Sequence, residues 1–556
     1  MKSDIQIAQS IQLKHIGQIA EKLQIQASDI DLYGKYKAKL PLNLIDNDKI
    51  SRCKLILVSA ISPTPAGEGK TTTSIGLSEG LNRIGKKTTV VLREPSLGPV
   101  FGIKGGAAGG GWSQVLPMEE INLHFNGDFS AVEKAHNLLA ALIDNNLQNK
   151  KYSLGLDPRT IAWKRVMDMN DRALRHIIVG LGGTANGVPR ETGFDITAAS
   201  EIMAILCLSS SLEDLKNRMG NIFVGFTMDK KPIYARDLKA QGAMATLLKD
   251  AIRPNLVQTI EGNPAIIHGG PFANIAQGTN TILATKMGMS LSDYVVTEAG
   301  FGFDLGAEKF LNIKCRTAGL SPNAVVIVAT VRALKYHGGQ SLKALGEPNP
   351  KAVSKGCANL EKHLENAKQF GIPAVVAINR FSNDTEEELA VIREKCQKLG
   401  VEAIDSEVWA KGGEGAIDLA RSVSKIADEW HTPFIPTYDW NASVEEKISA
   451  IATKIYGAAN VEYSSDAKSD MKRIQNLGLD KLPICVAKTQ KSLSDNPDLI
   501  GRPKDFTLHV REIEVAAGAG FIVPITGDMM RMPGLPDLPA AENIDINSSG
   551  VIEGLF

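Results

Sequence analysis

Residues 54–94 read KLILVSAISPTPAGEGKTTTSIGLSEGLNRIGKKTTVVLRE, and this stretch decides the fold. The apolar run 54–62 predicts a buried strand. A helical pattern follows Lys70 and ends near Gly85, and residues 88–92 predict a second buried strand. A glycine-rich turn, residues 64–69 (here called the glycine loop), lies between the first strand and the helix. The stretch is therefore a βαβ unit with a candidate phosphate loop at its first turn.

The glycine loop has the chemistry of an anion site. Gly67 and Gly69 allow backbone N–H groups to surround a phosphate, and the following helix directs its positive end there. Lys70 offers a charge for the β and γ phosphates, and Thr71 offers a hydroxyl for Mg²⁺. The pattern departs from G-x-x-x-x-G-K-[ST] because Thr64 replaces the first glycine. The alternative is a glycine turn before an ordinary core helix.

Length and composition limit the function classes. A chain of 556 residues predicts about two to four domains. The 62 basic and 62 acidic residues balance, and only 5% of residues are aromatic. These numbers argue against a nucleic-acid platform, although a local basic patch could lie within a balanced total.

The cysteines and the N-terminus indicate the compartment. The six cysteines are far apart and form no C-x-x-C pair, so we expect reduced, buried thiols rather than a zinc cluster or a disulfide framework. The N-terminal segment lacks the apolar core of a signal peptide, and no window approaches about 18 apolar residues. We expect a soluble, cytoplasmic protein with no membrane contact.

The rest of the chain repeats the order strand, turn, helix. This pattern predicts an α/β fold: a P-loop NTPase-like, mostly parallel sheet covered by helices, with smaller α/β domains added. We expect a nucleotide-binding domain over 1–345, with a helical N-terminal arm at 1–50 and a subdomain inserted near 130–260. A proline-rich hinge candidate at 346–354 then opens a C-terminal α/β region, 346–556, of one or two subdomains.

Arg93 and Glu94 end the second strand, where ligands bind in open parallel sheets. An arginine there can neutralise a transferring phosphoryl group, or it can pair with Glu94. The glycine-rich segment 101–112 is either a linker or a backbone that approaches a ligand closely. Two functions remain open from the residues alone. One is an ATP-dependent ligase that activates a small acid as an acyl phosphate, and the other is a P-loop switch or assembly ATPase that acts on a protein partner.

Five segments together resemble one known family. They are 64–71 (TPAGEGKT), 93–99 (REPSLGP), 101–111 (FGIKGGAAGGG), 328–339 (VATVRALKYHGG) and 532–536 (MPGLP). The chain resembles formate–tetrahydrofolate ligase (formyltetrahydrofolate synthetase) of the monofunctional bacterial type. In that family the first position of the glycine loop is a threonine, as Thr64 is here.

The resemblance implies a role in one-carbon metabolism. ATP, formate and tetrahydrofolate give ADP, phosphate and 10-formyltetrahydrofolate through formyl phosphate. It further implies a homotetramer that uses ATP with Mg²⁺ and is activated by a monovalent cation, K⁺ or NH₄⁺.

The resemblance also implies site residues. Lys70, Arg93 and Glu94 are the implied catalytic residues, and Thr71 is the implied Mg²⁺ ligand. The implied nucleotide-binding residues are Thr64, Pro65, Ala66, Gly67, Glu68, Gly69, Lys70, Thr71 and Thr72. The implied substrate-binding residues are Arg93, Glu94, Gly105, Gly106, Asp128, Phe381 and Trp409, the last two as an aromatic pair around the pterin ring.

Overall fold

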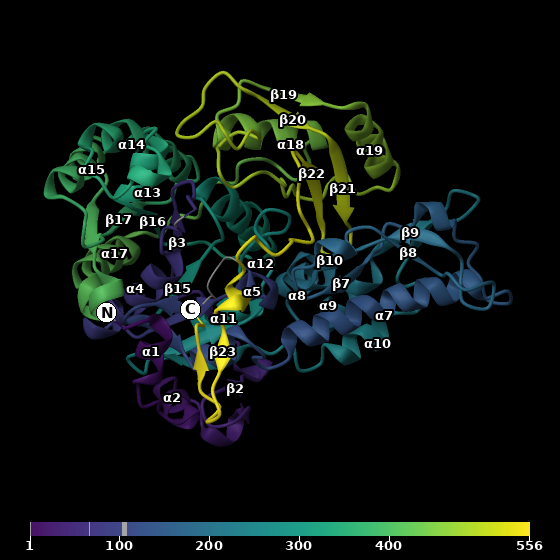
Figure 1. Cartoon of the computed structure of the whole chain (residues 1–556), viewed down its shortest axis with the longest axis horizontal. Coiled ribbons are helices and arrows are strands. Elements are labelled where there is room, and N and C mark those ends of the chain that lie inside the picture. The colour runs from purple at the N-terminus through teal and green to yellow at the C-terminus, as the bar shows by residue number, and fades with distance from the viewer. Residues whose placement is uncertain (1, 66, 103–107, 556) are drawn as a thin grey trace.

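The computed structural model describes residues 2–65, 67–102 and 108–555. Within these residues a 12-stranded sheet forms the centre of the molecule (Figure 1). Its parallel part follows the order β14-β4-β15-β3-β16-β17-β18. These strands are β14 (Pro264–Ile267), β4 (Thr88–Leu92), β15 (Tyr294–Glu298), β3 (Lys54–Ala60), β16 (Ala324–Ala329), β17 (Ala374–Asn379) and β18 (Ala403–Ser406). The prediction of a mostly parallel sheet in an α/β fold is confirmed.

The central strands are buried on both faces, which explains their continuous apolar sequences. In β3, Ile56 and Val58 face a cluster formed with α4 (Lys70–Arg83) and α17 (Ile417–Glu429). Leu55 and Leu57 face the opposite cluster, which includes side chains of α11 (Ile282–Leu291), α13 (Val331–His337) and α14 (Pro350–Gln369). Alternation along the strand therefore supplies both helical layers with core contacts.

An antiparallel extension continues the sheet beyond β14. It consists of β13 (Asn255–Thr259), β2 (Ala38–Lys39), β1 (Asp31–Leu32), β6 (Ser113–Leu116) and β5 (Gly109–Gly110). The prediction that residues 1–50 form a helical arm is therefore only partly right. The short helices α1 (Asp4–Gln9), α2 (Ile16–Lys22) and α3 (Asn47–Ile50) are present, but β2 pairs with β13 in the sheet. Its fully buried Lys39 forms an ion pair with Asp128.

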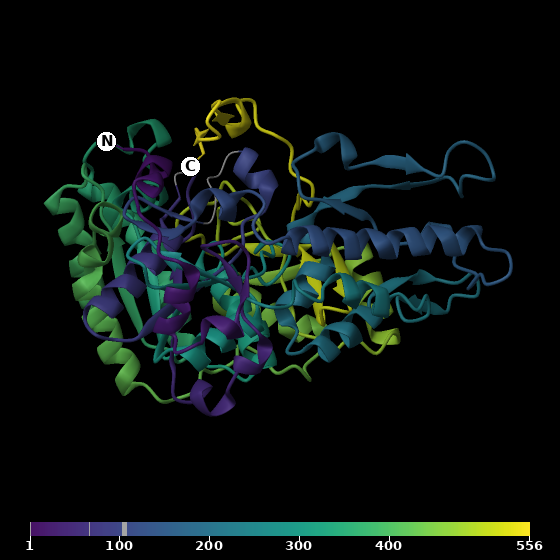
Figure 2. The ribbon, with the colours of Figure 1, turned by 90° about the horizontal axis from the view of Figure 1, so that it is seen from below.

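Residues 128–252, here called the middle region, extend to one side of the sheet (Figures 1 and 2). Their helices are α7 (Asp128–Gln148), α8 (Glu201–Leu208), α9 (Leu212–Gly220) and α10 (Gln241–Leu247). Their strands pair in twos: β7 (Arg165–Met167) with β10 (Phe194–Ile196), β8 (Ile177–Val179) with β9 (Arg190–Thr192), and β11 (Phe223–Phe226) with β12 (Pro232–Tyr234). The hairpin β8–β9 lies at the outer part of this region, away from the sheet.

The sheet runs across the predicted division at residue 346, because β17 and β18 pair in parallel with the strands before it. Pro350 is the first residue of α14, where proline lacks an N–H that a helix would not have used. Farther along the chain come α15 (Glu386–Lys398), α16 (Val408–Lys411), α18 (Val444–Ala450) and α19 (Ser465–Asn476). The last strands are β19 (Asn460–Tyr463), β20 (Thr507–Val510), β21 (Glu512–Ala516), β22 (Phe521–Ile525), β23 (Asp545–Ile546) and β24 (Ile552–Glu553).

The turn of the β21–β22 hairpin contacts the middle region. The carboxylate of Glu201 in α8 accepts hydrogen bonds from the backbone N–H groups of Gly518 (2.7 Å) and Ala519 (3.2 Å). A Cβ atom at residue 518 would lie 2.7 Å from the carbonyl oxygen of Arg218, so this contact requires glycine. The alanine- and glycine-rich turn thus joins two parts of the chain that are far apart in sequence.

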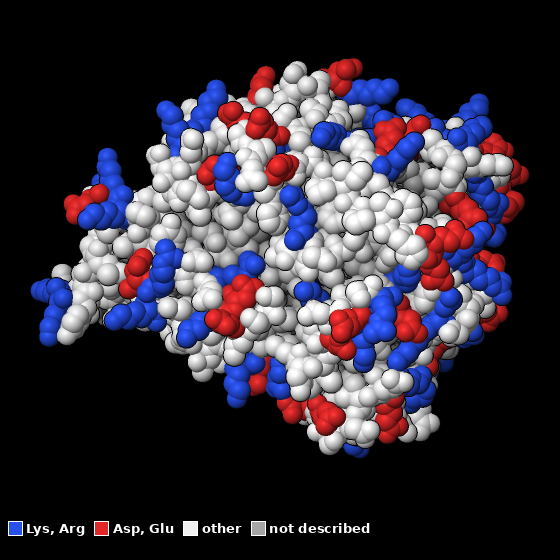
Figure 3. All heavy atoms as spheres, turned by 180° about the vertical axis from the view of Figure 1, so that it is seen from behind, with Lys and Arg blue, Asp and Glu red and all other residues white. Residues whose placement is uncertain are grey.

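All six cysteines are buried free thiols, as the sequence predicted. On the face shown in Figure 3, basic and acidic side chains are interspersed. No helix of the described residues combines the length and the apolar composition that a membrane crossing needs.

Candidate functional site

The glycine loop connects β3 to α4 in a conformation that needs glycine. Gly67 and Gly69 have φ angles of +74° and +76°. Asn379, the last residue of β17, donates a hydrogen bond from Nδ2 to the Glu68 carbonyl oxygen at 3.0 Å. A Cβ atom at residue 69 would lie 2.4 Å from this Nδ2 atom. Gly69 therefore permits both the left-handed backbone and the approach of Asn379.

The loop is also closed upon itself. The Glu68 carboxylate accepts hydrogen bonds from the backbone N–H (2.7 Å) and the hydroxyl (3.1 Å) of Thr64. A glycine at residue 64 would lack the hydroxyl bond, which gives a physical reason for the departure from the usual pattern. Pro65 and Gly67 are exposed at the mouth of the loop, and Thr72 is half-buried in α4. Ala66, Gly105 and Gly106 lie outside the described residues.

A buried carboxylate joins the first turn of α4 to the end of β4. Glu298 ends β15, the strand between β3 and β4, and its side chain is 2% exposed. Its Oε2 atom accepts a hydrogen bond from Thr71 Oγ1 at 2.9 Å, and its Oε1 atom lies 3.7 Å from Arg93 Nη2. Burial lowers the pKa of Lys70, while the carboxylates of Glu68 and Glu298 oppose that shift. The Glu298 carboxylate thus lies near two cations, Lys70 and Arg93, and near the Thr71 hydroxyl.

Sequence reasoning missed Glu298. The available signal was an acidic residue at the carboxyl end of a buried strand, which is where parallel sheets bind ligands. The sequence did not specify that β15 would lie between β3 and β4.

Arg93 faces the loop that follows β15. A Cβ atom at Gly300 would lie 2.9 Å from Arg93 Nη1 and 2.6 Å from Ala273 Cβ, so these groups are closely packed. Phe301 has a φ angle of +59°, a conformation that non-glycine residues rarely adopt outside constrained sites. Arg93 Nε is buried, and the described residues offer it no hydrogen-bond acceptor. The guanidinium thus keeps a donor for a ligand.

Glu94 is buried beside Arg93, within reach of other buried charges. Its N–H donates to the Gly269 carbonyl oxygen at 2.9 Å, and its side chain is buried. Burial raises the pKa of Glu94 well above its ordinary value; Asp128 adds to the shift, and Lys39 opposes it. No donor among the described residues lies within hydrogen-bonding distance of Glu94 Oε2. Glu94 is therefore a carboxyl group that readily holds a proton.

Asp128 is close enough to influence Glu94, but both of its oxygens already have partners. Oδ1 pairs with Lys39 Nζ at 2.6 Å, and Oδ2 accepts a hydrogen bond from Asn255 Nδ2 at 2.8 Å. The ion pair is buried, with exposed side-chain fractions of 0% for Lys39 and 2% for Asp128. Asp128 thus has a structural partner at each oxygen, in addition to the role in substrate binding that the sequence analysis gave it.

Phe381 and Trp409 follow neighbouring strands, β17 and β18, and both are half-buried. The guanidinium carbon of Arg332 lies 4.2 Å from the centroid of the Phe381 ring. Trp409 packs against Gly110 and Gly111, and a Cβ atom at residue 111 would clash with the Trp409 carbonyl oxygen (2.1 Å) and ring (2.8 Å). The strand order therefore places these groups in one row along the carboxyl ends of the parallel strands, here called the row. It begins with the aromatic pair, continues with Asn379 and the glycine loop and then Glu298, and ends with Arg93 and Glu94.

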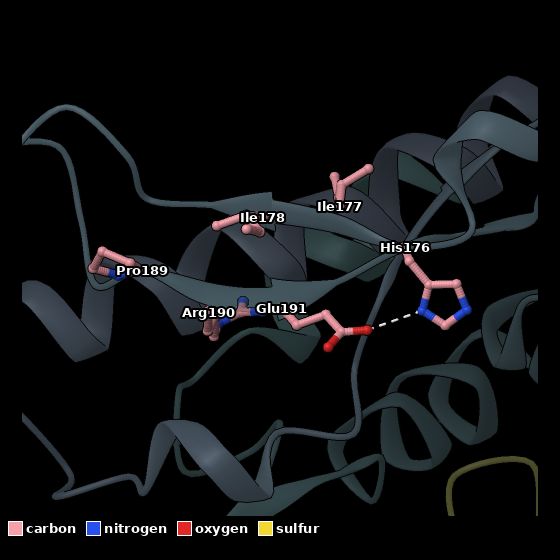
Figure 4. Close-up of a pocket in the computed structure, with 6 residues that line it drawn as sticks. All are labelled: His176, Ile177, Ile178, Pro189, Arg190 and Glu191. Carbon is pink, nitrogen blue, oxygen red and sulfur yellow. Dashed lines mark hydrogen bonds and ion pairs between the residues drawn. The ribbon is translucent and has the colours of Figure 1, made fainter.

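This row can hold a nucleoside triphosphate by its phosphates and place a second reactant beside Arg93. A separate hollow of about 520 Å³ lies on the β8–β9 hairpin and is lined by His176, Ile177, Ile178, Pro189, Arg190 and Glu191 (Figure 4). It contains none of the predicted site residues. Because the hairpin projects away from the sheet, we place the functional site in the row.

Comparisons with known proteins agree with the motifs. The family model described as Formate--tetrahydrofolate ligase matches residues 2–556. Among solved structures, a mutant of L. casei FPGS is 10% identical, with 82% of this chain and 81% of that chain covered and a TM-score of 0.20. Helicobacter pylori folylpolyglutamate synthetase is also 10% identical, with 86% and 91% covered and a TM-score of 0.21. Likenesses at these TM-scores carry no argument.

The close approach at Gly69 can be tested with a matched pair of variants, Gly69→Ala and Gly85→Ala. Both positions have positive φ, but no described atom lies within 4 Å of a Cβ at residue 85. Both variants carry the backbone strain, whereas only Gly69→Ala displaces Asn379, at a cost of about 1–3 kcal/mol. We expect the dissociation constant for ADP, measured by calorimetric titration, to rise about tenfold or more in Gly69→Ala alone. Equal binding by the two variants would show that the approach of Asn379 does not matter.

Proposed function

The chain belongs to the formate–tetrahydrofolate ligase family of ATP-dependent ligases, and we propose that it makes 10-formyltetrahydrofolate through formyl phosphate on a P-loop NTPase-like site. The observation that carries the proposal is the Glu298 carboxylate, which holds Thr71 beside Lys70 on one side and Arg93 on the other. A switch ATPase needs only Thr71 and Lys70, the groups that hold the nucleotide. Arg93 is the additional group that a second reactant at the γ phosphate needs.

In the first step a formate oxygen attacks the γ phosphorus of ATP. The bond from that phosphorus to the β–γ bridging oxygen breaks, and ADP leaves with the electron pair. Lys70 and the N–H groups of the glycine loop hold the phosphate oxygens, and residues 64–72 form the nucleotide site. Arg93 neutralises charge on the transferred group from the formate side.

The donor set at Thr71 fits Mg²⁺. A hydroxyl and a buried carboxylate are hard oxygen ligands, and they lie 2.9 Å apart at the first turn of α4. Thr71 and Glu298 would hold the ion. When bound, Mg²⁺ supplies positive charge that stabilises the phosphate oxygens during transfer.

In the second step the N10 amine of tetrahydrofolate attacks the formyl carbon. The bond from that carbon to the phosphate oxygen breaks, inorganic phosphate leaves, and N10 loses a proton. Glu94 in its ionised form accepts this proton, and its raised pKa makes that form a stronger base than an ordinary carboxylate. Arg93 and Lys70 retain the phosphate through both steps, which keeps formyl phosphate away from water.

The folate lies along the rest of the row. Phe381 and Trp409 hold the pterin ring by stacking, and Arg332 supports the Phe381 ring. The C-terminal region, 346–556, thereby contributes the folate site to the nucleotide domain, 1–345. Asp128 and the backbone at Gly105 and Gly106 complete the cleft. Family membership supports the further proposals of a cytoplasmic homotetramer and activation by K⁺ or NH₄⁺.

The direct test of the function measures ADP formation with ATP, formate, tetrahydrofolate and K⁺, omitting each in turn. We expect ADP and 10-formyltetrahydrofolate in equal amounts only in the complete mixture. Lys70→Ala and Arg93→Ala should each abolish product formation while the folded state persists, because each removes a charge from the transferred phosphoryl group. ADP release at full rate without formate and folate would support the switch ATPase instead.

The role of Glu298 predicts a change in metal dependence. In Glu298→Gln the carboxylate charge is lost while the shape is kept, so we expect the half-saturating free Mg²⁺ concentration to rise about 10- to 100-fold. Electron paramagnetic resonance of Mn²⁺ bound with ADP gives a second readout that does not depend on turnover. Thr73→Ala is the control, because the Thr73 hydroxyl is buried in α4, the helix that also contains Thr71, but has no hydrogen-bond partner among the described residues. Unchanged Mn²⁺ binding in Glu298→Gln would remove Glu298 from the metal site.

A further inference from the structure

Asp168 belongs to the middle region, yet its side chain reaches the segment that carries Arg93 and Glu94. It follows β7 directly and is 8% exposed. The Ser96 hydroxyl donates a short hydrogen bond to Asp168 Oδ1, and the Leu97 N–H donates to Oδ2 at 3.0 Å. Both carboxylate oxygens of Asp168 therefore accept hydrogen bonds from residues that lie only two and three positions after Glu94.

This contact acts as a helix cap supplied from another part of the chain. Ser96 precedes α5 (Leu97–Phe101), and its side chain makes no cap bond to that helix. Asp168 instead accepts from the first N–H of α5, where an acidic group also interacts favourably with the helix dipole. At the other side, the Gly269 carbonyl oxygen holds the Glu94 N–H. The short segment from Glu94 to Leu97 is thus fixed at both ends.

Neighbouring residues leave the segment little room to move. A Cβ atom at Gly98 would lie 2.4 Å from Asn170 Oδ1, and one at Gly102 would lie 2.8 Å from Asn170 Nδ2. Asn170 lies two residues after Asp168 in the same strand-to-turn connection. The middle region therefore contacts this segment through a carboxylate and through close packing.

We propose that Asp168 is a positioning residue for Arg93 and Glu94, and that through it the middle region controls the geometry of the reaction. The inference rests on the proposed function for its kinetic consequences. Its structural part, the restraint of residues 94–97, stands independently of any activity.

Charge provides a second effect of the same residue. The groups that influence Glu94 are Asp128, Lys39, Asp168 and Lys37, and those near Asp168 include Glu133 and His124. Burial raises the pKa of Asp168 to about 6, against the opposing hydrogen bonds from Leu97 and Ser96. Above pH 6 its negative charge therefore adds to the raised pKa of Glu94. Removing that charge lowers the pKa of Glu94, so ionised Glu94 persists to lower pH.

Asp168→Asn and Asp168→Ala separate the two effects. Asparagine can still accept from the Leu97 N–H, so this variant mainly loses the charge; we expect the acidic limb of kcat/KM for the full reaction to move to lower pH. Alanine also loses the restraint; we expect kcat to fall about 10- to 100-fold. Hydrogen exchange of a peptide within residues 93–102 should become about tenfold faster in Asp168→Ala. Ser96→Ala removes the hydroxyl donor but leaves the hydrogen bond from the Leu97 N–H to Asp168. We expect smaller changes of the same kind in kcat, in the pH profile and in hydrogen exchange.

Asp157→Asn is the matched control. Asp157 is 7% exposed, lies in the same region and caps a short helix of its own by accepting from the Arg159 N–H at 3.0 Å. Its hydrogen-bond partners among the described residues are Arg159, Thr160 and Phe226, and none of these belongs to the 93–102 segment. We therefore expect kcat, the pH profile and exchange in 93–102 to match the wild type.

The outcomes separate this inference from the proposed function. Wild-type protein without formate-dependent ligation would overturn the function, while exchange of the 93–102 peptide would still test the restraint. Active wild type, together with Asp168→Ala that keeps wild-type kcat and exchange, would overturn the inference alone. If Asp168→Ala does not fold, Ser96→Ala decides: unchanged exchange and an unchanged pH profile in that variant would also overturn it.

Discussion

The ionic contact at Glu298 organises the site. A carboxylate that is 2% exposed needs partners, since an unpaired buried charge is costly. Here the partners are the Thr71 hydroxyl and the Arg93 guanidinium, which lie in the segments that follow β3 and β4, the strands on either side of β15. The parallel arrangement makes this possible because it brings three strand ends to one edge. One acidic group thereby fixes the distance between the glycine loop and the arginine.

Charge changes in sign and strength along that edge. Lys70 and Arg93 concentrate positive charge at the place where we propose that phosphoryl transfer occurs. Beyond them, burial keeps Glu94 disposed to hold a proton, while the Lys39–Asp128 pair fills the interior behind it. Such an arrangement suits a reaction in which one phosphate is held through two steps and a proton leaves in the second.

The sequence predicted the local parts of this structure well. The apolar runs, Gly67, Gly69 and Lys70 predicted the strand, loop and helix that the structure contains, because these signals lie within one short stretch. The proline-rich segment near 350 was interpreted as a hinge, whereas Pro350 begins α14 and the sheet continues beyond it. For the polar residues 1–50 the sequence predicts only helices, because a two-residue strand carries no periodicity.

The long-range parts were beyond sequence patterns. The hydrogen-bonded residues Glu298 and Thr71 are 227 positions apart in the sequence, and Asp168 and Ser96 are 72 positions apart. Only the strand order and the packing of the middle region bring these pairs together.

The most direct test of the central claim uses formate labelled with heavy oxygen. If formate attacks the γ phosphorus at the site between Lys70 and Arg93, each turnover transfers one labelled oxygen to the inorganic phosphate, because the formyl carbon–oxygen bond breaks in the second step. The account predicts labelled phosphate in proportion to 10-formyltetrahydrofolate. Product formed with unlabelled phosphate would contradict it.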